Sequence, residues 1–490
     1  MVLAWGRGAV MGRWGGCVVL LLAGRAAGQA TLDADAAVTV AELSPWMGRG
    51  AGLEDANHEI TGGLWSQLVW GESFEEPPDA DGVSSRGTDP SPGADLTWVA
   101  SGPRSGGCSW SVAAGDAQTG VQSQQIRGAG CGVMNRGADA MGMAFEPSRD
   151  YNGFVFARLP AELQSLRAQT LDLEFRLLRL AGNATAGTVA STRVSVPADA
   201  LRAWTMVNFT LRTGPNASVG CFEDAHPASP CDGDVAEKQC YSCRGAFSIT
   251  LLSADLTVRL DMAYLAPGSW GQFQGLPVRK DVAELCTQTL NYTVQRFGGS
   301  MCNADEYRWK RFTGPFWERE PYAGIWYGRG SEFQSPGWRV WEFLQFCEAT
   351  RMQAVVTLNN KESPSDMADL VEYAYGDAVE TALGRQRAAD MPAHPHPFQP
   401  FIVEIGNEQA LDATLLSDTI AIAKAMGKRA TELRLKAPLS FAVGGLAGGW
   451  TPKDVAPFQQ AIDALPASGV NASWFFDFHI GGDSPIGREA

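Results

Sequence analysis

Hydrophobic and polar positions follow three successive patterns along the 490-residue chain. Close to the N-terminus, an apolar run over residues 17–23 follows Arg7 and Arg13 and precedes a series of small residues. This pattern is typical of a secretory signal peptide, because the run is shorter than the roughly 20 residues that span a bilayer. An uncleaved anchor or an organellar transit peptide is the alternative interpretation.

Between about residues 96 and 268, apolar and polar residues alternate in short stretches. Turns rich in Gly, Asn and Pro separate them. Because successive side chains of a strand point to opposite faces, this alternation predicts half-buried strands. We therefore expect a β-sandwich or jelly roll, with strands that include 170–178, 205–211, 247–252 and 256–262.

After about residue 270, helical periodicity alternates with short apolar runs, which predicts a parallel sheet with crossover helices. With an opening strand near 50–54 the chain has six β units, whereas a complete barrel has eight. The fold class is therefore α/β, with an incomplete (β/α)8 TIM barrel of about six β units. Strands are expected at 292–297, 353–358, 401–405, 439–443 and 474–478, and helices at 279–290, 338–350, 364–374, 412–435 and 452–465.

These patterns divide the chain into four parts. Residues 1–28 form the signal peptide, and residues 29–95 hold the first barrel strand and a solvated linker rich in Pro, Gly, Ser and Asp. Residues 96–268 form the sandwich, which is inserted into the barrel or precedes it. Residues 269–490 form the barrel domain, truncated after about its sixth strand.

The composition and net charge of the chain argue against nucleic acid and membranes as binding partners. A hydrophobic content of 45% and a charged content of 19% describe a globular chain, and no later stretch is long and apolar enough to cross a membrane. The net charge is −15, and removal of residues 1–28 takes away three arginines and no acids, giving −18. Such a chain repels nucleic acid and anionic membrane surfaces, so we expect neither as a partner. The 16 tryptophans suit the faces of sugar rings, although most tryptophans simply fill a core.

Ten cysteines and five glycosylation sequons support export, and we expect a secreted, extracellular or cell-wall protein. Four cysteines lie between 221 and 243 in a loop rich in Pro, Gly and Asp, which predicts two disulfides. A zinc knot that includes Cys240 and Cys243 is the alternative. We expect Cys302 and Cys347 to be buried thiols, and we expect no metal and no cofactor.

The most informative stretch for chemistry is an apolar strand that ends in Gly406, Asn407 and Glu408. Barrel enzymes keep their active sites at the carboxyl ends of their strands, and alternation would place residues 404, 406 and 408 on one face. Glycoside cleavage needs a carboxylic acid there to protonate the departing oxygen. The alternative is a strand-to-helix turn in which Asn407 caps the helix and Glu408 complements its dipole.

Two further features accompany this strand end. Glu404 lies deeper in the strand and needs a buried partner, for which Arg296 at the end of the preceding strand is a candidate; we interpret this pair as structural support. Gly298 and Gly299 follow Arg296, and paired glycines let the backbone approach a ligand closely. Ser300 or Asn303 could then reach substrate.

Several further stretches lie between residues 48 and 482: Gly52–His58 with Gly62–Leu64, Arg296–Lys310 with Gly314–Pro321, Asp366–Tyr373 and Val403–Glu408. Together they resemble glycoside hydrolase family 51, the α-L-arabinofuranosidases. The residues before a Pro-Gly turn, Leu260–Met262, resemble the eukaryotic or algal members, which carry a carbohydrate-binding-like sandwich before the second barrel strand.

The resemblance implies a retaining enzyme that releases terminal α-L-arabinofuranosyl groups from arabinan, arabinoxylan or glycoprotein glycans. Glu408 would be the general acid/base, and the residues Glu54, Asn407, Ser300, Asn303 and His479 would line the sugar subsite. Many members have Asn directly after the paired glycines, where this chain has Ser300. Bacterial members often have an aromatic residue two positions after the residue that corresponds to His479, where this chain has Gly481. The nucleophile would lie on a seventh strand, so we expect it to be missing from this chain.

Two alternatives stay open at this point. Another retaining glycosidase of the same barrel clan, such as a xylanase or glucanase, would share the Asn-Glu strand end. An inactive truncated product could also act as a carbohydrate-binding protein through the sandwich.

Overall fold

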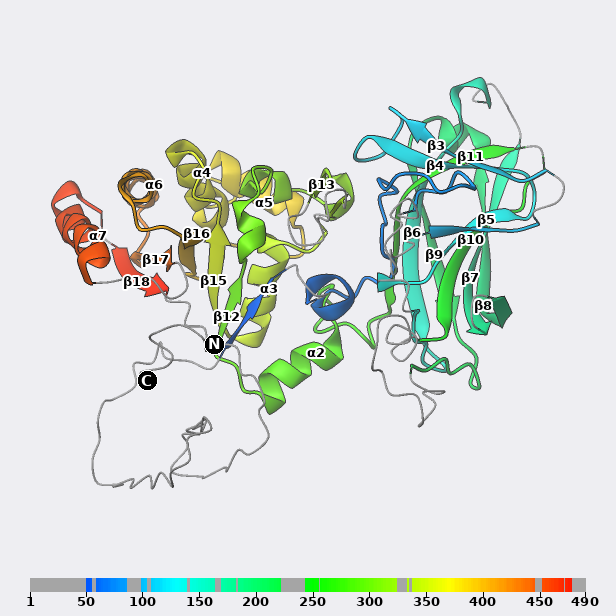
Figure 1. The fold of residues 1–490 in the computed structure, drawn as a ribbon, viewed down its shortest axis with the longest axis horizontal. Coiled ribbons are helices and arrows are strands. Elements are labelled where there is room, and N and C mark those ends of the chain that lie inside the picture. The colour runs from blue at the N-terminus through cyan, green and yellow to red at the C-terminus, as the bar shows by residue number, and fades with distance from the viewer. Residues whose placement is uncertain are drawn as a thin grey trace, which may run out of the picture.

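A computed structural model describes residues 50–54, 59–85, 98–103, 107–138, 142–163, 169–181, 184–221, 243–254, 256–323, 333–334, 337–445, 452–470 and 472–477. Two bodies lie side by side, a parallel α/β unit and an antiparallel β-sandwich (Figure 1). The expected signal peptide, Cys231, Cys240 and His479 lie outside the described residues. Among those residues, none of the helices has the length and apolar character needed to cross a membrane.

The α/β unit is built on a sheet of six parallel strands whose order in space equals their order in the chain. This strand order is that of a singly wound barrel whose first and last described strands are not paired, so the expectation of an incomplete barrel with about six β units is confirmed for the described residues. The strands are β1 (Gly50–Leu53), β12 (Val294–Phe297), β15 (Gln353–Leu358), β16 (Ile402–Gln409), β17 (Leu439–Gly445) and β18 (Ala472–Asp477).

Helices cross between these strands, and two of the crossover helices begin at side-chain caps. Ser363 accepts a hydrogen bond from the backbone of Asp366 with a proline at the first helical position, and Asp412 accepts one from Leu415. One helix, α5, lies in a segment predicted to be a loop. The sequence did not indicate it, because its residues lack a continuous apolar stripe. The helices are α2 (Lys280–Glu284), α3 (Val340–Thr350), α4 (Pro364–Tyr375), α5 (Ala382–Asp390), α6 (Ala413–Glu432) and α7 (Pro452–Ala464).

The second body consists of two five-stranded antiparallel sheets, which confirms the predicted sandwich. Phe175, Phe209 and Phe247 stack between the sheets, with ring centroids 4.0 Å apart for the first two. One sheet contains β2 (Trp98–Ser101), β5 (Cys131–Asn135), β10 (Gly245–Leu251), β7 (Thr170–Ala181) and β8 (Ala184–Pro197). The other contains β3 (Ser109–Ala114), β4 (Gln122–Arg127), β11 (Thr257–Pro267), β6 (Asp150–Arg158) and β9 (Thr205–Arg212).

Part of the predicted linker packs against this sandwich. Phe74, just before the linker expected at 77–92, stacks on Trp98 with ring centroids 4.7 Å apart, and Val83 and Ser84 within the linker are fully buried. Residues 83–85 of the linker are therefore not solvated, because Val83 belongs to the sandwich core. The linker residues that are exposed, as expected for a solvated segment, are Pro77, Pro78, Ala80 and Asp81.

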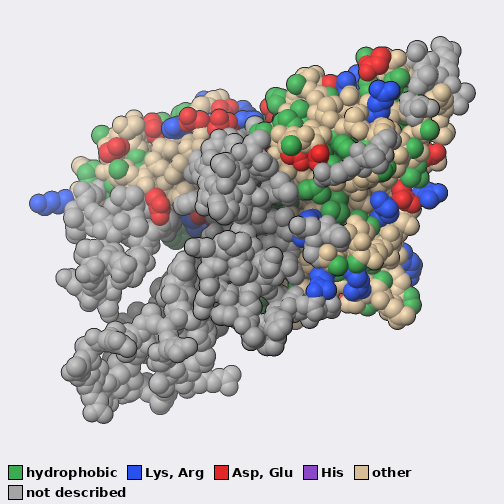
Figure 2. Space-filling model, turned by 45° about the vertical axis from the view of Figure 1, so that its right-hand side comes forward, with side chains coloured by type: hydrophobic (Ala, Val, Ile, Leu, Met, Phe, Trp, Pro, Cys, Tyr) green, Lys and Arg blue, Asp and Glu red, His purple; other side chains and the backbone are tan. Residues whose placement is uncertain are grey.

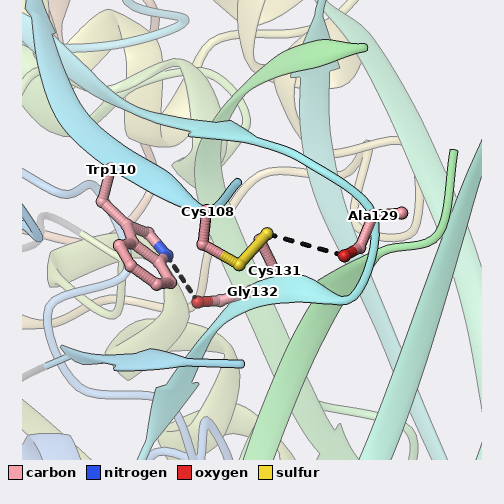
Figure 3. Close-up of a disulfide and its surroundings, with 5 residues drawn as sticks. All are labelled: Cys108, Trp110, Ala129, Cys131 and Gly132. Atoms are coloured by element: carbon pink, nitrogen blue, oxygen red, sulfur yellow. Dashed lines mark hydrogen bonds between the residues drawn. A yellow bond between two sulfur atoms is a disulfide. The ribbon is translucent and has the colours of Figure 1, made fainter. Parts of the chain in front are cut away.

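Two disulfides lie in the sandwich. Cys108, just before β3, is bonded to Cys131 in β5, so this bridge ties one sheet to the other (Figure 3). Beside it, the indole N–H of Trp110 donates a hydrogen bond to the carbonyl oxygen of Gly132 at 2.8 Å. Sequence analysis missed this bridge, since the two cysteines lie 23 residues apart with no recognisable spacing.

The second disulfide joins Cys221 to Cys243. Its location in the cysteine-rich loop agrees with the predicted disulfides, and it contradicts the zinc alternative because Cys243 is already bonded to sulfur. Cys302 and Cys347 are buried thiols, as expected.

An aromatic cluster joins the two bodies. Tyr264 of β11 lies 5.3 Å from Phe316, and Phe154 of β6 lies 5.6 Å from Trp317, measured between ring centroids. Both partners belong to the 3-10 turn η8 (Phe316–Glu318) that follows β12. The loop after the second barrel strand therefore rests on the sandwich.

Candidate active site

Most of the expected site residues lie at the carboxyl ends of neighbouring barrel strands. Glu54 follows β1, and Ser300 and Asn303 belong to the 3-10 turn η6 (Ser300–Asn303) that follows β12. Asn407 and Glu408 lie at the end of β16. In a parallel barrel these ends meet on one face, which is where barrel enzymes bind their substrates.

The end of β16 is a bulge and not a regular strand. Ile405 pairs with Val443 of β17, and the next pairing is Gln409 with Gly445, so three residues of β16 face one residue of its partner. Gly406 has φ 76° and Glu408 has φ 51°, both in the left-handed region. The expectation that residues 404, 406 and 408 share a face is therefore wrong, because the bulge breaks the alternation.

The bulge separates the environments of Asn407 and Glu408. Asn407 is 2% exposed and faces the interior of the sheet, whereas the adjacent Glu408 is exposed. A non-glycine residue with positive φ is strained, and such strain is concentrated at functional sites. The geometry brings a carboxyl group to the surface at the carboxyl end of the sheet.

Beneath the bulge, Arg296 and Glu404 form the predicted ion pair. The guanidinium donates two parallel hydrogen bonds to the carboxylate, Nε to Oε2 at 2.6 Å and Nη2 to Oε1 at 2.9 Å. Thr357 of β15 adds a third donor to Glu404 at 2.5 Å. Since Glu404 is fully buried, these bonds supply the partners that a buried carboxylate requires.

The same guanidinium orients Asn407. Nη2 of Arg296 donates to Oδ1 of Asn407 at 2.8 Å, so the amide nitrogen of Asn407 faces the opposite side, toward Ser300 Oγ at 3.4 Å. That long contact leaves Asn407 Nδ2 suited to donate to a sugar hydroxyl. Arg296 thus joins the structural pair to a residue expected to bind substrate.

Glu54 lies against the glycine pair that follows β12. The backbone N–H of Met301 lies 3.3 Å from Oε1 of Glu54. A Cβ atom on Gly299, whose φ is 105°, would lie 2.3 Å from the carboxyl carbon of Glu54. The close approach expected for the glycines is therefore made to Glu54, and glycine is the residue that permits it.

Asn303 and Gln409 share one backbone acceptor. The amide nitrogen of Asn303 donates to the carbonyl oxygen of Asn407 at 3.1 Å, and the amide nitrogen of Gln409 donates to the same oxygen at 2.7 Å. Gln409 also donates to Oδ1 of Asn303 at 3.0 Å. Sequence analysis missed Gln409. The signal that could have found it is Gly406, because a glycine inside a strand often marks a bulge, and Gln409 lies at the end of that bulge.

The nearby thiol does not fit a nucleophile. Cys302 donates to the carbonyl oxygen of Thr357 at 3.2 Å, and burial raises the pKa of its thiol to about 12. A thiol with that pKa stays protonated at neutral pH, and the thiolate is the nucleophilic form. Within the described ranges, no group of three or more His, Cys, Asp or Glu side chains is arranged to hold a metal ion.

Residues 286–437 match the protein family described as the alpha-L-arabinofuranosidase 1 domain. This segment includes Arg296, Ser300, Asn303, Asn407 and Glu408. It ends before β17 and therefore covers the part of the barrel from β12 through α6.

Two relatives extend the match. The extracellular exo-alpha-L-arabinofuranosidase of Streptomyces chartreusis is 26% identical over 396 residues, which are 74% of this chain and 40% of the relative. The structure of an arabinose-bound family 51 α-L-arabinofuranosidase matches 82% of this chain and 59% of its own, with a TM-score of 0.59 and 22% identity. The chain thus spans less than two thirds of either relative, and the match confirms the expected resemblance to family 51 and the combination of barrel and sandwich.

Proposed function

We propose that this chain, whose residues 286–437 carry an alpha-L-arabinofuranosidase 1 domain, binds and helps to cleave terminal α-L-arabinofuranosyl groups of polysaccharides or glycoproteins. Glu408 acts as the general acid/base, while Asn407, Glu54 and Ser300 bind the sugar hydroxyls. The supporting observation is the β16 bulge, which exposes Glu408 beside the buried, Arg296-oriented amide of Asn407.

The chemistry requires a carboxyl group that gives a proton to the departing oxygen and later takes one from water. Glu408 suits both steps because it is exposed at the strand end where barrel substrates bind. Retention also requires a second carboxylate about 5–5.5 Å from the first. Glu404 does not suit that role, since Arg296 and Thr357 already bind both of its oxygens. We therefore assign the nucleophile to no described residue.

We also propose that the protein is secreted and glycosylated. The extracellular relative supports export. Three sequon asparagines lie in the described residues, and Asn208, Asn216 and Asn291 are all exposed, as attachment of a glycan requires. His479 stays a proposed subsite residue at the end of β18.

The proposal is tested with the full-length natural protein on a panel of 4-nitrophenyl glycosides and on arabinan and arabinoxylan. We expect release of L-arabinose from the α-L-arabinofuranoside and from both polysaccharides, with no cleavage of the β-D-xyloside or β-D-glucoside. Replacing Glu408 by Gln should lower kcat/KM on arabinan by about 100- to 10,000-fold, because the proton donor is lost. Glu432→Gln, an exposed change at the end of α6, is the matched control and should leave the rate unchanged.

Other outcomes would support the alternatives. Preferential cleavage of the xyloside or glucoside would assign the chain to another glycosidase of the same barrel clan. Binding to arabinoxylan without any turnover, unchanged in the Glu408→Gln variant, would support a carbohydrate-binding protein.

A further inference from the structure

The peptide bond between Asn407 and Glu408 is held from two directions. Its carbonyl oxygen accepts one hydrogen bond from Asn303, on the turn after β12, and one from Gln409, on the strand itself. The two amides are also bonded to each other at 3.0 Å. The plane of this peptide sets φ of Glu408 and hence the direction of its side chain.

We propose that Gln409 and Asn303 are positioning residues, which hold the Glu408 carboxyl group in the orientation needed for proton transfer to the leaving group. This inference rests on the proposed function of Glu408. It changes the expectation for Asn303, whose amide nitrogen and oxygen both bond to protein groups and thus hold the bulge instead of lining the sugar subsite.

The conformation of the bulge explains why such a support is needed. Glu408 has φ 51°, a region that side-chain-bearing residues rarely adopt, so the local backbone would relax without restraint. Gln409 folds back over the bulge: a Cβ atom on Gly406 would lie 2.7 Å from Cγ of Gln409. The glutamine therefore packs against the strained segment as well as bonding to it.

The turn that carries Asn303 also contacts Glu54. Met301 in η6 lies within 3.3 Å of the Glu54 carboxylate, whereas Asn303 in the same turn bonds to the β16 bulge. One short turn thus sets the location of the acid/base relative to a carboxylate proposed to bind the sugar. Loss of the Asn303–Gln409 contacts should disturb proton transfer more than sugar binding.

Leaving-group dependence separates positioning from a merely structural role. A nitrophenolate departs without protonation, whereas a methanol or sugar leaving group requires the acid. The ratio of kcat/KM for 4-nitrophenyl α-L-arabinofuranoside to that for methyl α-L-arabinofuranoside therefore reports on how well the acid is placed. A general loss of folding or binding would lower both values together.

The experiment compares Gln409→Met and Asn303→Ala with Glu408→Gln in the full-length natural protein. Methionine keeps the length of Gln409 but removes its two donors. Gln399→Met, the same change at an exposed site just before the opposite end of β16, is the matched control. We expect Gln409→Met to lower kcat/KM on the methyl glycoside by about 10- to 100-fold and on the nitrophenyl glycoside by less than about threefold.

The outcomes distinguish the inference from the proposed function. Glu408→Gln should show the same selectivity in a stronger form, and Gln399→Met should show none. Equal losses on the two substrates, or no loss, for both Gln409→Met and Asn303→Ala would overturn the positioning role while leaving that of Glu408 intact. Absence of selectivity in Glu408→Gln itself would overturn the proposed function and this inference with it.

Discussion

At the scale of single residues, three carboxylates near the strand ends lie in different surroundings. Glu404 is fully buried and bonded to Arg296 and Thr357, and Glu54 lies against Gly299. Glu408 is exposed on the bulge. Because a proton donor must reach its substrate and a buried ion pair cannot, these surroundings support the structural role proposed for Glu404 and the chemical role proposed for Glu408.

The buried pair makes a prediction about stability. Arg296→Met would leave the buried Glu404 carboxylate without its two guanidinium donors, so we expect the free energy of unfolding to fall by about 3–5 kcal/mol. Denaturant unfolding measures this change. Arg202→Met is the control: its side chain is 45% exposed and its partner Asp199 is 64% exposed, so the loss should stay below about 1 kcal/mol. Equal effects of the two changes would contradict a structural role for Arg296.

At the scale of elements, the β16 bulge is the feature on which the site depends. The bulge places two extra residues of β16 opposite β17. Within it, Asn407 is buried and the next residue, Glu408, is exposed. The inserted residues extend the strand end toward η6, where Asn303 bonds to it. The bulge therefore allows one strand to supply the buried Glu404 and the exposed Glu408.

Gly406 offers a direct test of the bulge. Its φ of 76° disfavours any residue with a Cβ atom, and that atom would meet Gln409 at 2.7 Å. We expect Gly406→Ala to lower the free energy of unfolding by about 1–3 kcal/mol. In the control Gly187→Ala, in β8, the added Cβ would contact nothing within 4 Å, and the change should be neutral or slightly stabilising. A neutral Gly406→Ala would show that the bulge relaxes freely.

Sequence patterns predicted the regular elements well. The strand at 353–358 was expected with the bounds that β15 has, and the helix expected at 364–374 differs from α4 by one residue, because apolar periodicity is set by burial on one face. The bulge at Gly406 could not be predicted in the same way, because it depends on pairing with β17. The contacts of Gln409 were missed because they involve a turn 106 residues earlier in the chain.

At the scale of the whole molecule, buried carboxylates of the sandwich support its contact with the barrel. Asp261 accepts hydrogen bonds from the backbone of Gln118 and Thr119, and Glu75 accepts hydrogen bonds from the backbone of Val121 and Gln122. The Thr119 hydroxyl in turn donates to the carbonyl oxygen of Arg319 in the barrel at 2.7 Å. Unlike these buried carboxylates, the charged side chains on the described part of the surface in Figure 2 are scattered among uncharged ones.

These carboxylates predict how stability depends on pH. Burial raises the pKa values of Glu75 and Glu76 from 4.5 to about 7, and burial also raises the pKa of Asp261 well above its usual value. The folded state thus binds protons more tightly than the unfolded state. The contribution of Glu75 and Glu76 is fully present below pH 4.5 and is lost as pH rises through about 7.

We therefore expect the free energy of unfolding to decrease between pH 4.5 and 7, by about 2–3 kcal/mol for each of these two glutamates. Denaturant unfolding at several pH values measures the slope. Glu75→Gln should make the slope shallower, because the amide does not titrate. Glu162→Gln, an exposed change in the sandwich, should leave the slope unchanged. A slope of the opposite sign would contradict the buried, protonated state.

The central claim, that Glu408 is the acid/base of a retaining arabinofuranosidase, is tested most directly by azide rescue. Glu408→Ala in the full-length natural protein is assayed on 4-nitrophenyl α-L-arabinofuranoside with and without sodium azide. Azide needs no general base to attack a glycosyl–enzyme intermediate, so we expect turnover to rise by about tenfold or more. The product should be α-L-arabinofuranosyl azide, the retained anomer. No acceleration by azide, or formation of the inverted β anomer, would contradict the assignment.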